Sequence, residues 1–294
     1  MWSTECVVAS LGRPLSSATM ARAPLIPRFE PDGAPVSFLI DYDGTISLVD
    51  VADNLLRRFV TDPVLAAELA DKDLAYAAGG IGSRELMRWD MEILPRDPAL
   101  LRETAAAAPH DPTFVDFVRA ARARGAALEI VSDGLGFYLE PALAALGLGD
   151  LPVATNDNDL GAPPPALDFP YGHPRCQVCG TCKRERVRAH QAAGQTVVFV
   201  GDGVSDRFAA AHADVVFAKD QLAELCAQEG WPFRPWGTFS EIARWMTEAF
   251  DLRELPASQT APEGRRDRPP DRRGFVCGPE VWGPHRLTPG PAPG

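Results

Sequence analysis

Long apolar runs and an excess of positive charge are both missing from this chain of 294 residues. No apolar stretch approaches the roughly 20 residues of a membrane-spanning helix, so we expect none. Lys and Arg number 29 against 40 Asp and Glu, which gives a formal charge of −11. Because a surface that neutralises nucleic-acid phosphates must be basic, we expect neither nucleic-acid binding nor adhesion to an anionic membrane.

Cysteine and lysine are also scarce. Of six cysteines, Cys176, Cys179 and Cys182 fall within seven residues, too close together to staple a fold of this length. The N-terminus lacks the apolar core of a signal peptide, so a reducing cytosol is the expected compartment. Residues 10–28 contain Ser and Arg without acids and faintly resemble a transit peptide, but an upstream extension with Met20 as the start is the plainer interpretation.

Composition divides the chain into a globular part and two tails. Hydrophobic residues make up 46%, enough for a sizeable core in one or two domains. Residues 1–35 carry five prolines and no clear periodicity, and we expect them to be irregular. Residues 251–294 are rich in Pro, Gly and Arg and cannot bury enough apolar area to offset the entropy of ordering, so we expect disorder.

Short apolar runs alternate with helical patterns in the globular part. The runs are brief, β-branched and continuous, as in strands buried on both faces: 36–40, 127–131, 196–200 and 214–217. Helical patterns separate them at about 112–124, 136–147, 184–193 and 206–212. This alternation predicts an α/β fold with a doubly wound parallel sheet, formed by residues 36–48 and 109–250. Residues 49–108 contain four helical segments (51–60, 63–76, 83–93, 98–107) and no strand candidate, which predicts a small helical cap at the carboxyl edge of the strands.

Two carboxylates, Asp41 and Asp43, directly follow the first predicted strand in FLIDYDGTIS. A spacing of two residues places both side chains on one side of the extended chain. Buried paired carboxylates repel one another and need a cation or a shared proton. A calcium loop starting at Asp41 would need Gly and an acid where Ile46 and Ala52 stand, so a catalytic pair or a simple turn remains.

A second acidic pair, Asp202 and Asp206, follows another predicted strand in VFVGDGVSDRF. A dinucleotide-binding loop would need glycine where Asp206 stands, and a carboxylate there would repel pyrophosphate. The pair suits a divalent metal, and Asp206 is also placed to cap the following helix.

The third and fourth features are weaker alone. Ser132 ends a predicted strand, with Gly134 before a helix, and a hydroxyl beside free backbone amides can cradle phosphate. A serine at a strand end is more often only a cap. Lys183 begins a predicted helix and by itself is typical of a surface lysine.

In this order, the DxDGT run, the strand-end Ser132, Lys183 and the GDxxxD run resemble the haloacid dehalogenase-like phosphohydrolase superfamily over residues 36–245. The resemblance implies that Asp41 is a nucleophile that forms an aspartyl-phosphate and that Asp43 is the general acid and base. Dehalogenases of the superfamily lack the second aspartate, so Asp43 favours a phosphatase.

The resemblance also implies where phosphate and Mg²⁺ bind. The implied phosphate-binding residues are Ser132, Asp133, Gly134 and Lys183. Asp202 is expected to bind Mg²⁺ together with the Asp41 carboxylate and the Asp43 main-chain carbonyl, while Asp206 orients metal-bound waters. Mg²⁺ prefers carboxylate oxygens and retains waters, which suits a site with few protein ligands.

The helical insertion resembles the phosphoserine phosphatase-like branch. Residues 80–95 and 169–187, with their Cys-x-x-Cys-x-x-Cys-Lys run, resemble the family of 2-hydroxy-3-keto-5-methylthiopentenyl-1-phosphate phosphatases, which act in methionine salvage. The chain departs from that pattern by its long tails and by Asp133, where glycine is expected. The expected partner is therefore a small phosphorylated metabolite, and the sequence carries no signal for an oligomeric state.

Two clusters allow further interpretations. A zinc site is one interpretation of the residues His173, Cys176, Cys179 and Cys182, which recur every three positions. A packed thiol loop that supports Lys183 is the other, because four ligands at this spacing fit one tetrahedral ion awkwardly. In the cap, Arg84 or Glu85 could contact the leaving group, or could belong to a solvated helix face.

Alternative activities stay open at this point. Phosphoserine or another small phosphoester is the alternative substrate, because Arg84 and Glu85 could pair with its charged groups. A phosphotransferase would need a closed, water-free site. A non-catalytic phosphate-binding module would lack at least one of the motif residues, and none is missing.

Overall fold

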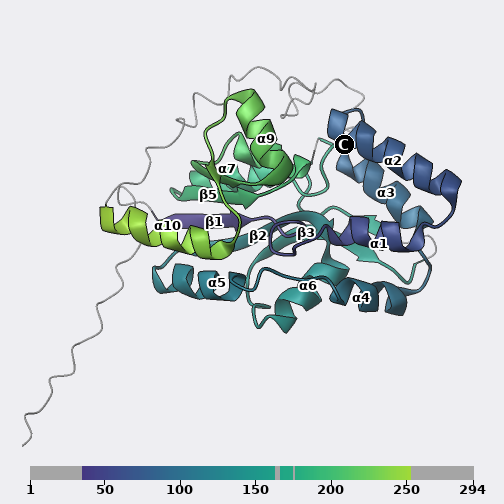
Figure 1. Ribbon diagram of the computed structural model, residues 1–294, viewed down its shortest axis with the longest axis horizontal. Helices are drawn as coiled ribbons and strands as arrows, with labels where there is room; N and C mark the ends of the chain where they lie inside the picture. The colour runs from purple at the N-terminus through teal and green to yellow at the C-terminus, as the bar shows by residue number, and fades with distance from the viewer. Residues whose placement is uncertain (1–34, 163–165, 175, 253–294) are drawn as a thin grey trace, which may run out of the picture.

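A seven-stranded sheet forms the centre of the computed structural model, which describes residues 35–162, 166–174 and 176–252 (Figure 1). The expectations for the two tails lie outside these residues. The strands, in chain order, are β1 (Val36–Ile40), β2 (Ala127–Leu135), β3 (Val153–Asp159), β4 (Ala166–Asp168), β5 (Thr196–Gly201), β6 (Val215–Ala218) and β7 (Arg234–Pro235).

The strand order across the sheet is β4-β3-β2-β1-β5-β6-β7, which puts β1 in the middle. All neighbouring pairs are parallel except β3 and β4. All five residues of β1 are buried, as a continuous apolar strand covered on both faces requires. The predicted doubly wound parallel sheet is confirmed.

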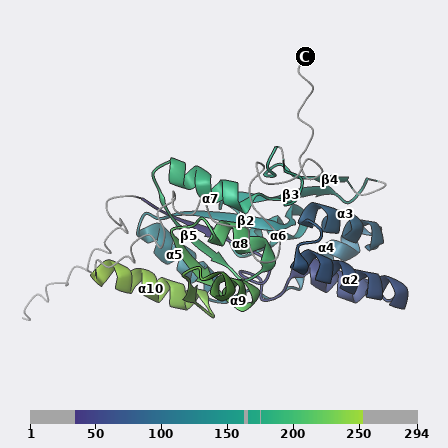
Figure 2. The ribbon, with the colours of Figure 1, turned by 90° about the horizontal axis from the view of Figure 1, so that it is seen from above.

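Helices cover both faces of the sheet (Figures 1 and 2). The first face carries α5 (Phe114–Ala123), α6 (Gly136–Ala145) and α10 (Phe239–Leu252); the second carries α7 (Lys183–Ala192), α8 (Arg207–Ala210) and α9 (Asp220–Glu229). Side chains alternate along β1, so Phe38 and Ile40 pack in the first buried cluster and Leu39 in the second.

Five helices lie between β1 and β2, and the first four of them fall within the residues predicted for the cap. These four are α1 (Val51–Phe59), α2 (Pro63–Ala78), α3 (Ser83–Ile93) and α4 (Pro98–Ala106). Leu55, Met91 and Leu101 from these helices belong to the same buried cluster as the sheet residues. The cap therefore shares its apolar packing with the core, and its division into a separate domain stays a prediction.

Several elements differ from the sequence-based expectation. Strand β2 runs four residues further than expected, because residues after a register shift at Val131 pair with β3. The sequence of β3, VATNDND, is mostly polar and only three of its residues are buried, so its pattern did not predict a strand. Helices α9 and α10 and the short strands β4 and β7 were also not predicted.

The aromatic residues near the C-terminal end of the described chain are packing residues. Trp231, Trp236, Phe239 and Trp245 are all buried. Among residues 35–162, 166–174 and 176–252, no helix combines the length and apolarity needed to cross a membrane. The cytosolic location stays a prediction.

Candidate active site

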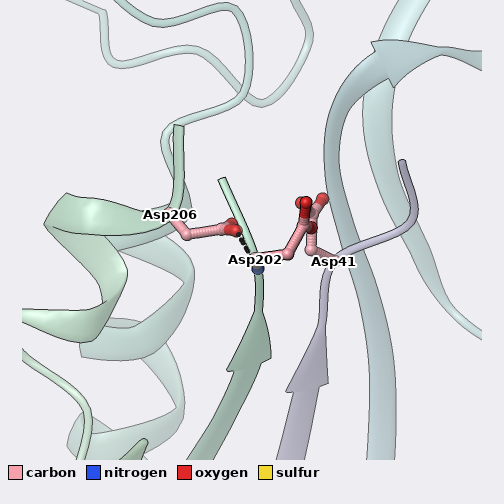
Figure 3. A group of neighbouring side chains, drawn as sticks. All are labelled: Asp41, Asp202 and Asp206. Atoms are coloured by element: carbon pink, nitrogen blue, oxygen red, sulfur yellow. Dashed lines mark hydrogen bonds between the residues drawn. The ribbon is translucent and has the colours of Figure 1, made fainter. Parts of the chain in front are cut away.

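The site begins where two neighbouring parallel strands end. Ile40 of β1 pairs with Val200 of β5, and the Asp41 amide donates to the Val200 carbonyl at 2.9 Å. This register brings Asp41, one residue past β1, next to Asp202, one residue past β5 (Figure 3). Because the two strands are parallel, their carboxyl ends lie at one sheet edge and their carboxylates converge.

Asp41, Asp202 and Asp206 form an acidic trio with ligand oxygens within 4.8 Å of one another. Burial, followed by the repulsion of Asp206, raises the pKa of Asp202 to about 7 and that of Asp41 well above its usual range. Protonation or a cation must offset this repulsion. The trio therefore offers hard oxygen donors that suit Mg²⁺.

The donors of this trio are not equivalent. One oxygen of Asp206 accepts from the amides of Asp202 and Gly203, both at 3.0 Å, while the other pairs with Lys183 at 2.6 Å. The carboxylate of Asp206 is thus largely used within the protein. This fits Asp41 and Asp202 as direct ligands of the metal and Asp206 as a residue of the surrounding shell.

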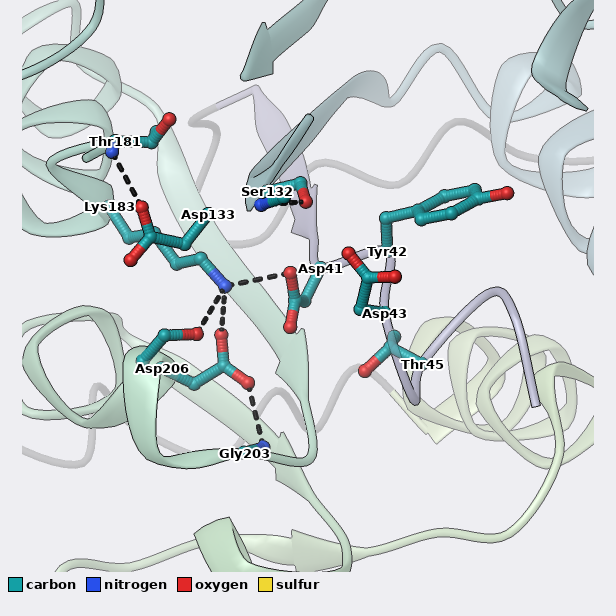
Figure 4. Close-up of polar contacts among 12 residues, drawn as sticks. Asp41, Tyr42, Asp43, Thr45, Ser132, Asp133, Thr181, Lys183, Gly203 and Asp206 are labelled. Atoms are coloured by element: carbon teal, nitrogen blue, oxygen red, sulfur yellow. Dashed lines mark hydrogen bonds and ion pairs between the residues drawn. The ribbon is translucent and has the colours of Figure 1, made fainter. Parts of the chain in front are cut away.

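Lys183 opens α7 and reaches the trio with a side chain that is only 2% exposed (Figure 4). Its Nζ atom lies 2.7 Å from Asp41 Oδ1 and donates to Ser205 Oγ at 3.0 Å. Burial alone would lower the pKa of Lys183, but Asp206 and Asp41 raise it well above its usual value. The lysine is therefore a fixed cation beside the Asp41 carboxylate.

Asp43 is placed differently from Asp41 although both follow β1. Its two oxygens accept from the Val51 amide at 3.0 Å and from the Tyr138 hydroxyl at 2.8 Å. Burial, with a further contribution from the charge of Asp50, raises the pKa of Asp43 to about 8. An acid with this pKa is largely protonated at neutral pH and can donate a proton.

The turn after Asp43 ties β1 to β5. Thr45 Oγ1 donates to Asp202 Oδ1 at 2.6 Å. Gly44 has φ of +72°, and a Cβ atom there would collide with the Asp202 carboxylate. Both the positive φ and the lack of space for a Cβ atom require glycine at this position. The sequence pattern included Thr45 and Gly44 without predicting these contacts.

Ser132 and Gly134 line the site from β2. Ser132 is fully buried, and its Oγ accepts from the Gly134 amide at 2.9 Å. A Cβ atom at Gly134 would collide with Asp43 and with the hydroxyl of Tyr138. Tyr138, on α6, was not predicted as a site residue because a tyrosine in an apolar helix is typical of a core residue.

The side chain of Asp133 contacts the chain segment that precedes Lys183. Its Oδ1 accepts from the Thr181 amide at 2.8 Å and from Asn156 Nδ2 at 3.3 Å. The carboxylate is therefore used by the chain that precedes Lys183 (Figure 4). Phosphate binding at Asp133 stays a prediction, and its carboxylate is engaged by Thr181 and Asn156.

The two cap candidates lie in different surroundings. Arg84 is buried; its Nε donates to the Cys179 carbonyl at 2.6 Å and its guanidinium lies 4.9 Å from the centre of the Phe169 ring. Glu85 is exposed. The substrate contact expected from one of them stays a prediction, and Arg84 hydrogen-bonds to Gln177 and Cys179 of the segment before Lys183.

The four zinc candidates are not brought together. Among the described residues, the acidic trio is the only group of three or more metal-ligating side chains close enough to share an ion, so no three of His173, Cys176, Cys179 and Cys182 do so. Cys176 and Cys179 pack against the cluster of Val178 and Phe208. Burial raises the pKa of the Cys182 thiol to about 11. A packed thiol loop ahead of Lys183 is the interpretation that this arrangement favours.

Curated relatives share most of this globular region. A 2-hydroxy-3-keto-5-methylthiopentenyl-1-phosphate phosphatase of Brevibacillus brevis is 27% identical over 217 residues, which covers 69% of this chain and 91% of that protein. The enzyme of the same name from Exiguobacterium sibiricum is 29% identical, over an alignment that covers 70% of this chain and 94% of that enzyme.

Solved structures share the fold. A phosphoserine phosphatase structure described as a phospho-aspartyl intermediate analogue superposes with a TM-score of 0.56, at 15% identity, over 72% of this chain and 99% of its own. Phosphoserine phosphatase from T. onnurineus gives a TM-score of 0.53 at 16% identity, over 77% of this chain and 98% of that protein's chain.

The family model for haloacid dehalogenase-like hydrolases matches residues 38–211, a span that starts in β1 and contains Asp41, Lys183 and the GDxxxD run. With more than half of its residues in that match and the motif side chains gathered at one sheet edge, the chain belongs to the haloacid dehalogenase-like hydrolase family.

Proposed function

We propose that this chain is a Mg²⁺-dependent phosphomonoesterase that acts on a small phosphorylated metabolite through an aspartyl-phosphate. The observation that carries the proposal is the pairing of Asp41 with Lys183 at 2.7 Å, with Asp43 two residues away as a carboxyl group of raised pKa. A nucleophilic carboxylate, a cation for the phosphoryl oxygens and a proton donor are the three groups that this reaction needs.

The chemistry divides between the two aspartates. The Asp41 carboxylate attacks phosphorus, the bond from phosphorus to the alcohol oxygen breaks, and Asp43 gives its proton to the departing oxygen. Asp43, now a carboxylate, then takes a proton from a water molecule that attacks the phosphoryl group on Asp41. Phosphate leaves and the Asp41 carboxylate is restored. Two easier steps replace one difficult displacement.

Fixed polar groups hold the transferred phosphoryl group. Lys183 supplies a positive charge, and the Ser132 hydroxyl and nearby backbone amides supply donors. Asp41, Asp202 and the Asp43 carbonyl would hold Mg²⁺, which offsets the charge on the phosphoryl oxygens. The acidic trio fits this cation because its oxygens converge and because burial, followed by the repulsion of Asp206, raises the pKa values of Asp41 and Asp202.

The surroundings of Arg84 favour an uncharged leaving group. Phosphoserine would bring an α-carboxylate, which needs a cation from the cap, but Arg84 donates to Cys179 and Gln177 instead. The leaving group of 2-hydroxy-3-keto-5-methylthiopentenyl-1-phosphate carries no charge. We therefore propose a substrate of that kind, with phosphoserine and other small phosphoesters as alternatives.

Phosphate release from a substrate panel tests the proposal. The panel contains p-nitrophenyl phosphate, phosphoserine, phosphocholine and the enol-phosphate generated in situ, each with Mg²⁺. Release that needs Mg²⁺ and is fastest, by kcat/KM, for the enol-phosphate supports both the activity and the substrate. A faster reaction with phosphoserine would replace the proposed substrate, and no release by folded protein from any of the four would contradict the phosphatase.

A further inference from the structure

The carboxylate of Asp133 lies where three parts of the chain meet. Asp133 itself belongs to β2, next to Ser132. Its Oδ1 accepts from the Thr181 amide at 2.8 Å, at the end of the cysteine segment, which we define as residues 176–182. The Ser83 hydroxyl, at the start of the cap helix α3, donates to the Val178 carbonyl of the same segment at 3.4 Å.

The cysteine segment is held on its other side by the cap. The Gly180 amide donates to Ser83 Oγ at 3.1 Å, and the Arg84 amide donates to the Val178 carbonyl at 3.2 Å. A Cβ atom at Gly82 would collide with Val178. The cap therefore contacts this segment at close range through both main-chain and side-chain groups.

The segment leads directly into Lys183. Cys182 is the N-cap residue of α7 and Lys183 its first residue, and the Lys183 amide donates to the Thr181 carbonyl at 3.0 Å. The side chain of Cys182 makes no cap hydrogen bond. The start of α7 is thus fixed by the contacts of Thr181, and Thr181 is fixed by Asp133.

Asn156 completes the junction from β3. Its Nδ2 donates to the carbonyls of Asp133 and Gly134, at 2.9 Å and 3.1 Å, and its Oδ1 accepts from Thr181 Oγ1 at 3.2 Å. The first two contacts tie Asn156 to the end of β2, and the third ties it to the cysteine segment. Asp133 is half-buried, and a carboxylate withdrawn from water is costly unless such donors surround it.

We propose that Asp133 is a positioning residue, which fixes the cysteine segment to β2 and thereby sets Lys183 against Asp41. For its effect on turnover, this inference rests on the proposed phosphatase activity. Phosphoryl transfer depends on the placement of charge, and a displacement of about 1 Å can cost about 100-fold in rate. Asp133 acts through Lys183 and does not touch the phosphoryl group.

Thiol labelling tests the anchoring without any substrate. Cys182 is buried beside Thr181, whereas Cys226 is fully buried in α9, away from the segment. Asp133→Ala should raise the labelling rate of Cys182 by about tenfold while that of Cys226 stays unchanged, because one anchor of the segment is lost. Asp133→Asn keeps an acceptor for the Thr181 amide and should label at nearly the wild-type rate.

Kinetics with p-nitrophenyl phosphate tests the consequence for turnover. Asp133→Ala should lower kcat by about 10- to 100-fold with KM changed less than about threefold, and Asp133→Asn should recover most of kcat. Asp116→Ala, which removes an exposed carboxylate paired with Arg119 on α5, is the matched control and should change neither readout. Ser83→Ala, which keeps Asp133 intact, should raise Cys182 labelling to a smaller extent.

The labelling and kinetic results together decide whether Asp133 has the proposed positioning role. Wild-type labelling of Cys182 in Asp133→Ala, or an Asp133→Asn variant as impaired as Asp133→Ala, would overturn the positioning role. If Asp133→Ala does not fold, the Asp133→Asn and Ser83→Ala variants test the positioning role by the same labelling ratio, which is the labelling rate of Cys182 divided by that of Cys226. A wild-type protein that releases no phosphate would remove the proposed function, whereas the labelling ratio would still decide the anchoring.

Discussion

Two aspartates only two residues apart have different neighbours, and the proposed mechanism therefore assigns them different chemical tasks. Asp41 faces the ammonium group of Lys183, and Asp43 faces the Tyr138 hydroxyl and the Val51 amide. Replacing Asp41 by Asn should lower kcat by about 1,000-fold or more, because the amide cannot serve as the nucleophile. The measurement is phosphate release with a check of intact mass for covalent phosphate. Release by Asp41→Asn at the wild-type rate would exclude the aspartyl-phosphate route.

Asp43 should set the alkaline limit of the reaction. Its pKa is raised to about 8, chiefly by burial and then by Asp50. The acid form is needed in the first step, so kcat/KM for an alkyl phosphate should fall as the pH rises through about 8. p-Nitrophenyl phosphate has a good leaving group and should show a weaker fall.

Asp50 offers a matched test of the cause of that shift. Asp50→Asn removes the charge but keeps an N-cap side chain for α1, which now accepts from the Asp53 amide at 2.9 Å. The pKa of Asp43 should fall, and the alkaline limb of the pH profile should move to lower pH with little change in stability. An unmoved limb would assign the shift to burial alone.

At the scale of elements, ionic contacts between side chains tie β2 to α7. Glu129 of β2 is buried and accepts from Arg186 at 2.8 Å and 2.9 Å, and one of its oxygens lies 2.6 Å from His190 Nε2. Burial would raise the pKa of Glu129, but the hydrogen bonds from His190 and Arg186 outweigh it and lower the pKa. These contacts fix the helix that carries Lys183 to the strand that carries Ser132.

Replacing Glu129 by Gln should lower the free energy of unfolding by roughly 2 kcal/mol at neutral pH. Because the folded-state pKa is depressed, this stabilisation is full above the usual glutamate pKa and is lost as the pH falls through the folded-state value. Urea unfolding at several pH values measures it. The difference between wild type and Glu129→Gln should shrink on acidification, and a difference independent of pH would contradict the ionic explanation.

At the scale of the whole molecule, we expect the acidic trio to couple folding to cation binding. Asp41, Asp202 and Asp206 come from two strand ends and the turn before α8, and they meet only in the folded chain. A ligand that binds only the folded state stabilises it by about 2.7 kcal/mol at 100 times its dissociation constant. Mg²⁺ at that level should therefore raise Tm by several degrees over protein in EDTA, by about 2–4 °C per kcal/mol.

Asp202→Asn is the control for that measurement. The amide oxygen can still accept from Thr45, which donates to Asp202 at 2.6 Å, but the negative charge is lost. The variant should keep its Tm in EDTA or gain slightly, since repulsion within the trio is relieved, and its response to Mg²⁺ should be much smaller. An equal Mg²⁺ response in both proteins would place the cation elsewhere.

The sequence by itself determined the sheet centre, the cap and the motif residues. Continuous apolar runs such as VSFLI specify buried parallel strands, and polar residues directly after them must lie at the carboxyl edge, so Asp41 and Asp202 were predictable together. Only the tertiary structure decided what each side chain contacts. Tyr138 reaches Asp43 across 95 residues and Asp133 reaches Thr181 across 48, and such partners follow from the packing of α6 and the cysteine segment on the sheet. Local periodicity reports which face of an element is buried; it does not report which distant group will satisfy a buried carboxylate.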